Sequence, residues 1–209
     1  CKNEKKNDRM GKVLSISNHK GGVGKTTSAI NIGAALNKLG KKVLLIDLDP
    51  QANLSQSLGL INQEKTIYGA LKGEYKLEPI SVLKGLDIIP STLDLSGAEI
   101  ELSSEPGREY ILKELIENVR SSYDYIIIDC SPSLGLLTIN SFTAADEIII
   151  PLQAQFLAMQ GLAKLVEVVE KIKSRLNKGL KIGGVFITQY DGRKVLNRDV
   201  FETINEHFK

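Results

Sequence analysis

The stretch Ser17-Asn18-His19-Lys20-Gly21-Gly22-Val23-Gly24-Lys25-Thr26-Thr27 decides the fold of this chain. Its three glycines let the backbone turn tightly and bring successive N–H groups close to a bound anion. Lys25 adds a positive charge, and Thr26 adds a hydroxyl group suited to Mg²⁺. A helix that begins directly after the loop contributes the partial positive charge of its N-terminus. We therefore interpret the stretch as a phosphate-binding loop between a strand and a helix.

The loop departs from the usual P-loop pattern at one position. That pattern has a glycine five positions before its last glycine, and this chain has His19 there, followed by a second lysine, Lys20. A glycine-rich turn with a lysine by chance is the alternative interpretation, and the register of Lys25-Thr26-Thr27 between a strand and a helix argues against it. The arrangement resembles the deviant loop of the ParA/MinD family of ATPases. The resemblance implies that ATP phosphates are bound by Lys20, Gly21, Gly22, Val23, Gly24, Lys25, Thr26 and Thr27.

Hydrophobic periodicity along the chain predicts an α/β fold. We expect a three-layer P-loop NTPase with a mostly parallel central sheet and helices on both faces. Strands are predicted at 12–17, 43–46, 86–89, 125–128, 147–150 and 181–188, and helices at 26–39, 108–119, 136–145, 162–176 and 196–208. Residues 54–85 are expected to form a surface excursion with a short helical pattern near 67–71. We expect residues 1–9 to be a disordered extension and 10–209 to form a single P-loop ATPase domain.

Composition excludes several classes of protein. The 209 residues are 42% hydrophobic and 25% charged, which is typical of a globular domain. The formal net charge of +2 does not demand a polyanionic partner, so DNA binding would need a local basic patch. Two distant cysteines, Cys1 and Cys130, do not indicate a disulfide framework, and they favour the cytoplasm. A processed lipoprotein is the alternative for a chain that starts with cysteine. No apolar run is long enough to span a bilayer.

Carboxylates follow two of the predicted buried strands. Asp47-Leu48-Asp49-Pro50-Gln51-Ala52-Asn53 ends the second strand, and Asp129-Cys130-Ser131-Pro132 ends a later one. The carboxyl ends of parallel strands form the crevice where open α/β sheets bind ligands. An aspartate facing the loop threonine can hold Mg²⁺ through water, so Thr26 and Asp129 are the predicted metal site. Aspartates that only start a turn are the alternative for both segments.

The resemblance extends from Met10 to Lys209 and is closest to ParA-type partition ATPases of the Soj-like chromosomal group. Asp49 matches the residue that positions the attacking water, and Lys20 matches the lysine that crosses the dimer interface. Residues 90–102, 151–162 and 189–193 resemble segments beside the nucleotide, on the dimer face and near the adenine. The resemblance implies ATP hydrolysis with Mg²⁺, with catalytic Lys20, Lys25 and Asp49.

The same resemblance implies a homodimer on ATP binding, a ParB-like stimulator, non-specific DNA as a partner, and a cytoplasmic, nucleoid-associated protein without a membrane partner. Family members continue with a further strand and a C-terminal helix, which this sequence is expected to lack. Five basic residues are predicted to point outward, either as a solvated face or as DNA contacts; they are Lys164, Lys171, Lys173, Arg175 and Lys178.

Three other classes of P-loop protein share parts of this sequence pattern. A MinD-like membrane-associated positioning ATPase shares the fold and the chemistry, but Asp49-Pro50-Gln51-Ala52-Asn53 favours the DNA-binding group. A metabolic P-loop ligase such as a dethiobiotin synthetase would need a carboxylation site that the sequence does not indicate. Cys130 stands alone, and a lone cysteine does not support the iron–sulfur cluster of the nitrogenase iron protein.

Overall fold

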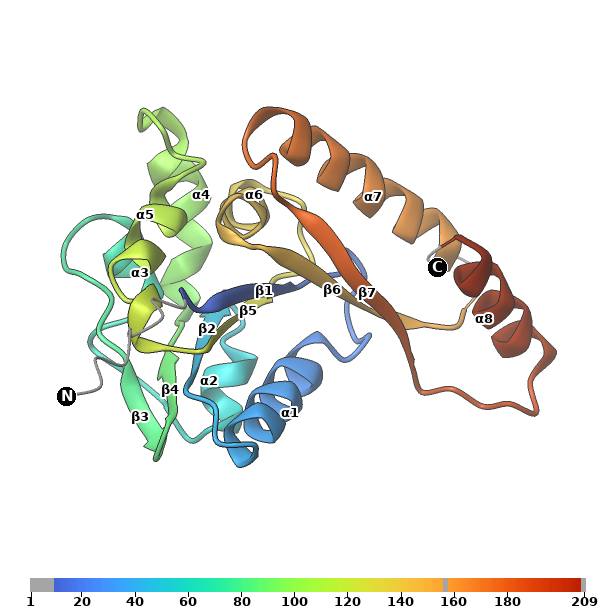
Figure 1. Ribbon diagram of the computed structural model, residues 1–209. Helices are drawn as coiled ribbons and strands as arrows, with labels where there is room; N and C mark the ends of the chain where they lie inside the picture. Colours follow the sequence, from blue (N-terminus) through green and yellow to red (C-terminus); the bar gives the residue numbers. More distant parts are fainter. Residues whose placement is uncertain (1–9, 156–157, 208–209) are drawn as a thin grey trace, which may run out of the picture.

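The computed structural model describes residues 10–155 and 158–207. The expected extension at 1–9 lies outside the described residues, as do Phe156 and Leu157 of the predicted dimer-face segment. Within the described residues, seven strands form one sheet in the order β3-β4-β2-β5-β1-β6-β7, with β3 antiparallel to β4 and the other pairs parallel (Figure 1). The strands are β1 Lys12–Ile16, β2 Val43–Leu48, β3 Ile80–Leu83, β4 Leu86–Ile89, β5 Tyr125–Cys130, β6 Glu147–Gln153 and β7 Lys181–Thr188.

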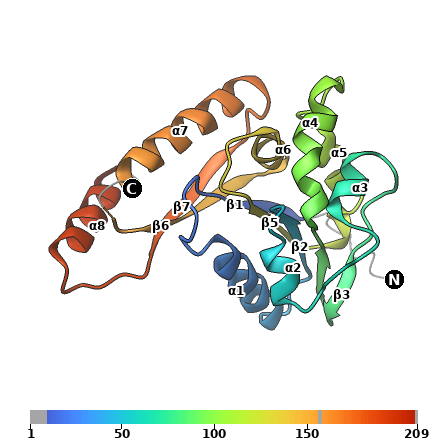
Figure 2. The same ribbon diagram turned by 180° about the vertical axis from the view of Figure 1, so that it is seen from behind.

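Helices cover both faces of the sheet. The α-helices are α1 Lys25–Lys38, α2 Asn53–Ser57, α3 Ile67–Leu71, α4 Ala98–Glu101, α5 Ile111–Glu117, α6 Leu136–Ala144, α7 Ala158–Arg175 and α8 Val195–His207, and short 3₁₀ turns lie at Leu93–Gly97, Leu102–Ser104 and Arg120–Ser122. Figures 1 and 2 show α1 and α2 on one face and α3 to α7 on the other. No helix in the described part of the chain is long and apolar enough to cross a membrane.

The central strands are buried on both faces, as parallel strands between two helical layers require. Ile126 and Ile128 of β5 pack into a core cluster with α3 to α8, whereas Ile127 packs into a second cluster with α1 and α2. Side chains of a strand alternate between its two faces, so one apolar run supplies both clusters. The predicted three-layer α/β fold with a mostly parallel sheet is confirmed.

Two expectations about the elements were wrong. Residues 54–85 are more than a surface excursion, because they contain α2, α3 and β3, and Ile67 and Leu71 are buried in the core. The four residues of β3 alternate between half-buried and exposed, which is the weak pattern of an edge strand. The first helix, predicted to end at Leu39, ends one residue earlier at Lys38, and Leu39 is 76% exposed.

The register of β5 with its two neighbours sets the position of the site. Asp129 of β5 lies level with Ile16 of β1 on one side and with Asp47 of β2 on the other. Ile16 is the last residue of β1, so the loop that follows it begins beside both aspartates. The carboxyl ends of the three central strands therefore meet at one edge of the sheet.

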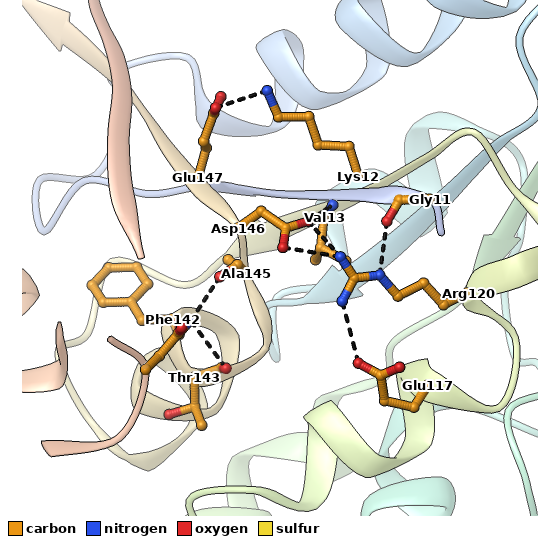
Figure 3. Close-up of polar contacts among 11 residues, drawn as sticks. Gly11, Lys12, Val13, Glu117, Arg120, Phe142, Thr143, Ala145, Asp146 and Glu147 are labelled. Carbon is orange, nitrogen blue, oxygen red and sulfur yellow. Dashed lines mark hydrogen bonds and ion pairs between the residues drawn. The ribbon is translucent and has the colours of Figure 1, made fainter. Parts of the chain in front are cut away.

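The opposite ends of the strands are held by Arg120, which follows α5 (Figure 3). Its Nε donates to the carbonyl oxygen of Gly11 at 2.8 Å, and its Nη1 pairs with Glu117 at 3.2 Å. Its Nη2 donates to both carboxylate oxygens of Asp146, at 2.9 and 2.7 Å, and Asp146 Oδ2 also accepts from the N–H of Val13. One guanidinium group therefore ties α5 to the starts of β1 and β6.

We expect Arg120→Ala to lower the free energy of unfolding by about 2–3 kcal/mol, because it leaves the Asp146 carboxylate and the Gly11 carbonyl without their partner. The Arg120 side chain is only 15% exposed, so solvent replaces these bonds poorly. The measurement is chemical denaturation. Arg193→Ala is the control, since Arg193 is 91% exposed in its pair with Asp191, and its loss should cost less than about 1 kcal/mol. Equal losses in the two variants would contradict the prediction.

Candidate nucleotide-binding site

The glycine-rich loop connects β1 to α1 and has the backbone that an anion cradle requires. Gly22 and Gly24 have positive φ angles of 72° and 89°, which side chains with a Cβ rarely adopt. Gly24 is the residue directly before α1, a helix of 14 residues. The N–H groups at the start of this helix therefore open toward the loop, where they have no partner within the helix.

Two side-chain hydrogen bonds hold the loop against the distant strands β6 and β7. Asn18 is buried, donates from Nδ2 to the carbonyl oxygen of Pro151 in β6 at 2.8 Å, and accepts at Oδ1 from the N–H of Lys20 at 3.0 Å. Thr188, the last residue of β7, donates from Oγ1 to the carbonyl oxygen of Val23 at 2.9 Å. Neither residue was predicted from the sequence to anchor the loop. The only indication in the sequence was position: Asn18 lies in the loop, and Thr188 ends a predicted strand.

A cavity of about 530 Å³ opens over the loop. Small-molecule sites have volumes of roughly 300–1,000 Å³, so this cavity has a suitable size. Its lining includes three of the glycines with Lys25, Thr26, Thr27 and Asp49, as predicted for the site. Residues that sequence reasoning did not assign to the site also line it; these are Gln51, Asn53, Ser57 and Pro132. Gln189 lines it as well. Gln189 belongs to the segment expected near the adenine, and its φ of 54° places it in the left-handed region.

Lys25 lies at the bottom of the site, only 7% exposed, and donates from Nζ to the carbonyl oxygen of Lys20 at 3.2 Å. Burial lowers the pKa of its ammonium group, while the nearby Asp129, Cys130 and Asp49 oppose the shift. An ammonium group held this far from water favours an anionic ligand that restores its lost hydration.

Asp129 is the strongest electrostatic feature of the site. It is 1% exposed, and neither carboxylate oxygen has a hydrogen-bond partner. Burial raises its pKa to about 7; Thr26 lies beside it and opposes the shift, although its hydroxyl does not reach hydrogen-bond geometry. A buried carboxylate without a partner beside a threonine hydroxyl fits a divalent cation, because oxygen ligands of this kind are what Mg²⁺ prefers.

The two aspartates of β2 and its following loop have different surroundings. Asp47 is fully buried and accepts from the N–H and hydroxyl of Ser55, at 2.9 and 2.7 Å, and from the N–H of Asp49 at 3.2 Å. Asp47 therefore fixes the shape of the loop. Asp49 is 8% exposed, lines the cavity and accepts from the N–H of Gln51 at 2.9 Å, which leaves its second oxygen available to a ligand.

Lys20 and Val23 do not line the cavity with their side chains. Val23 is buried, so its part in binding is restricted to its backbone. The Lys20 ammonium group donates to the side-chain oxygen of Gln155, which follows β6. The structure therefore brings Lys25, Thr26, Asp49 and Asp129 together and turns Lys20 toward the segment at 151–162, part of which lies outside the described residues.

Comparison with known proteins agrees with this geometry. A family model described as "AAA domain" matches residues 11–182. The chain is 46% identical to the chromosome-partitioning ATPase Soj of Treponema pallidum over 95% of this chain and 79% of that protein. The chain belongs to the Soj/ParA family of partition ATPases. It is thus a P-loop ATPase, and the predicted family resemblance is confirmed.

Solved structures similar to this Soj/ParA chain include two with a bound ATP analogue. A cobyrinic acid a,c-diamide synthase from Mycobacterium smegmatis with bound ATP analogue and magnesium has a TM-score of 0.90 and 38% identity, over 95% of this chain and 83% of that one. A putative plasmid partition protein from Borrelia burgdorferi bound to AMPPNP has a TM-score of 0.82 and 32% identity, over 94% of this chain and 83% of that one.

The raised pKa of Asp129 predicts a pH-dependent stability for the chain without nucleotide or divalent ions. Between about pH 4 and pH 7 the folded state binds a proton at Asp129 that the unfolded state has lost, so stability falls as pH rises through this range. Asp129→Asn removes the charge, and we expect it to raise the free energy of unfolding by about 2–3 kcal/mol at about pH 8 and by much less at about pH 5. Denaturation at the two pH values measures this; an equal effect at both would contradict it.

Proposed function

We propose that this ATPase binds Mg²⁺–ATP in the cavity over the glycine-rich loop, dimerises when ATP is bound, binds DNA non-specifically and segregates plasmid or chromosome DNA with a ParB-like partner. The observation that carries the proposal is the buried Asp129 carboxylate, which lies without a hydrogen-bond partner beside Lys25 and Thr26. The names of its relatives support the partition function, and the bound ATP analogue and magnesium of its structural neighbour support the ligand.

The residues of the site divide the work of ATP hydrolysis. The backbone N–H groups of 21–27 and the Lys25 ammonium group would hold the phosphates, and Thr26 and Asp129 would hold Mg²⁺. When bound, Mg²⁺ offsets the charge of the phosphate oxygens. Asp49 orients the attacking water with the carboxylate oxygen that Gln51 does not occupy. Catalysis by such a site is mainly positioning and charge stabilisation.

Lys20 serves the dimer in this proposal. Its ammonium group donates to Gln155, and Lys20 is not among the residues that line the cavity of its own chain. Both observations support a role for Lys20 at the phosphates of a second copy. ATP then becomes part of the interface between two copies, and the dimer forms only with nucleotide bound.

The DNA surface in this proposal is the outer face of α7 with the turn that follows it. Leu165, Val169 and Ile172 are buried against the core. The five basic residues predicted to point outward are all exposed; they are Lys164, Lys171, Lys173, Arg175 and Lys178. A basic stripe of this kind neutralises backbone phosphates without reading the base sequence.

An amide synthase is the second function that a neighbour's name suggests. Enzymes that release ammonia from glutamine need an accessible nucleophile. Cys130 is the one cysteine among the described residues; it is 1% exposed, and burial raises its pKa to about 11. The Cys130 thiol therefore does not provide such a nucleophile, and the observations favour partition.

Three alanine variants test the site. We expect Lys25→Ala to abolish nucleotide binding, Asp49→Ala to keep binding and dimerisation but slow hydrolysis about 10²-fold or more, and Lys20→Ala to keep binding in the monomer but prevent the dimer. Nucleotide titration, phosphate release and light scattering give the three readouts. Lys84→Ala, at an exposed lysine outside the cavity, is the control and should behave as the parent. ATP-dependent dimerisation of Lys20→Ala would refute the role of Lys20.

DNA binding separates this proposal from a MinD-like membrane ATPase. With ATP we expect a shift of non-specific DNA that weakens steeply with salt, and no sedimentation with anionic liposomes. The triple variant Lys171→Ala, Lys173→Ala and Arg175→Ala should reduce the slope of log K against log salt by about 2–3, as for three lost phosphate contacts. The matched control replaces three exposed lysines elsewhere, Lys38, Lys76 and Lys84, and should leave the slope nearly unchanged. Liposome binding without DNA binding would decide for the membrane function.

A further inference from the structure

A second hollow is lined by residues of α3, α4 and α5 and of the turns beside them. Figures 1 and 2 show these helices on the face of the sheet opposite α1. The hollow has a volume of about 430 Å³, and we call it the α3–α5 groove. Its apolar lining consists of Ala70, Leu71, Leu102, Ile111 and Leu115. None of its lining residues belongs to the nucleotide cavity, so the groove is a separate site with an apolar floor.

The polar lining of the α3–α5 groove is mostly acidic. Glu101, Glu105 and Glu114 line it together with a single basic residue, Lys72. Glu101 already accepts from the hydroxyl of Tyr68 at 2.9 Å and lies 3.6 Å from the Lys72 ammonium group. The carboxylates of Glu105 and Glu114 form no ion pair or hydrogen bond with any described side chain. The groove therefore carries two uncompensated negative charges beside an apolar floor.

The free carboxylates and the apolar floor together indicate which class of ligand fits the α3–α5 groove. Carboxylates repel nucleic acid and free phosphate. A divalent cation is disfavoured as well, because no group of His, Cys, Asp and Glu side chains among the described residues is arranged to hold a metal. A Lys or Arg side chain satisfies the free carboxylates, and apolar neighbours on the same segment cover the floor. We propose that the α3–α5 groove binds a segment of a protein partner in which basic and apolar side chains alternate.

The walls of the groove are tied to the nucleotide site through α6. Glu99 of α4 accepts from the N–H of Leu137 at 3.3 Å, and its carboxylate lies where a side chain at Gly135 would be. Asn140 of α6 accepts at Oδ1 from the N–H of Leu112 in α5 at 3.0 Å and donates from Nδ2 to the carbonyl oxygen of Arg108 at 2.7 Å. Both walls therefore contact α6 by hydrogen bonds from buried or half-buried groups.

α6 begins directly after the loop 131–135, which continues from Asp129 and places Pro132 in the lining of the nucleotide cavity. A segment that binds between α4 and α5 acts on Glu99 and Asn140, and through them on the start of α6. The partner therefore influences the loop 131–135 from outside the nucleotide cavity. This inference rests on the proposed function in taking the chain to be an ATPase with a protein partner, and it adds a surface that lies outside the nucleotide cavity and outside α7.

The binding test uses the intact chain and a short fluorescent peptide that alternates leucine with lysine. We expect saturable binding by fluorescence anisotropy, and none for the same peptide with glutamate in place of lysine. The double variant Glu105→Gln and Glu114→Gln should weaken binding about tenfold, as expected for two lost charge pairs. The matched control, Glu64→Gln and Glu202→Gln, removes the same charge from exposed positions outside the groove and should bind as the parent.

Equal weakening by both double variants would overturn the proposal, because binding would then follow net charge alone. Unchanged binding by the groove variant would also overturn it. Spermidine, added at the same concentration of positive charge as the peptide, tests whether the apolar side chains contribute to binding. Retained peptide binding supports the proposal. Complete displacement of the peptide would overturn it, because the groove would then bind a polyamine by charge alone. Circular dichroism of every variant confirms that the fold is intact.

Amide hydrogen exchange tests the connection to the nucleotide site. We expect the peptide to slow exchange both in the groove walls and in residues 131–140. Glu99→Gln should retain peptide binding but lose the effect at 131–140, because its amide accepts more weakly than the carboxylate at the start of α6. Slowed exchange that stays within α3 to α5 in the parent chain would show that the groove binds its partner without acting on the loop.

Discussion

The register of β5 between β1 and β2 is the constraint on which the rest of the structure depends. It aligns Ile16, Asp47 and Asp129 at one level of the sheet. A slip of one residue would turn Asp129 to the other face and move Ile128 out of its core cluster. Because three fully buried isoleucines of β5 fill both core clusters, hydrophobic packing determines where the carboxylate lies. The site is thus positioned by residues that have no part in its chemistry.

The same packing buries two charged side chains, Asp129 and Lys25, away from water. Asp129 is left without a hydrogen bond, and Lys25 is 7% exposed, so both groups lower the stability of the chain without a ligand. A folded domain tolerates such strain at a functional site when the surrounding core over-determines the fold. Asp47 shows the contrast: it is equally buried, but three donors surround it, and its role is to shape the loop. Burial alone therefore does not mark a ligand-binding carboxylate; burial without a partner does.

Local patterns in the sequence were sufficient for the core of the fold and of the site. The glycine-rich loop, the following helix and the aspartates after two apolar runs are features of short segments, and each was predicted from its own residues. The anchors of the loop were not, because Asn18 bonds to Pro151 and Thr188 bonds to Val23 across 133 and 165 positions. Those contacts depend on β6 and β7 lying next to β1, which no local pattern specifies. β3 was missed for a related reason: an edge strand half in water lacks a continuous apolar run.

α6 contacts the surroundings of both the nucleotide cavity and the α3–α5 groove. Its first residues follow the loop that continues from Asp129, and its Asn140 side chain bonds to α5 through both the oxygen and the nitrogen of the amide. Thr138, Asn140 and Ser141 are all buried in this helix, so their polar groups are satisfied by specific partners instead of water. A helix held by directional bonds moves as a unit, because a shift that breaks one of them leaves a buried polar group unpaired. α6 is therefore a common physical element that joins the loop 131–135, beside the nucleotide cavity, to the walls of the acidic groove.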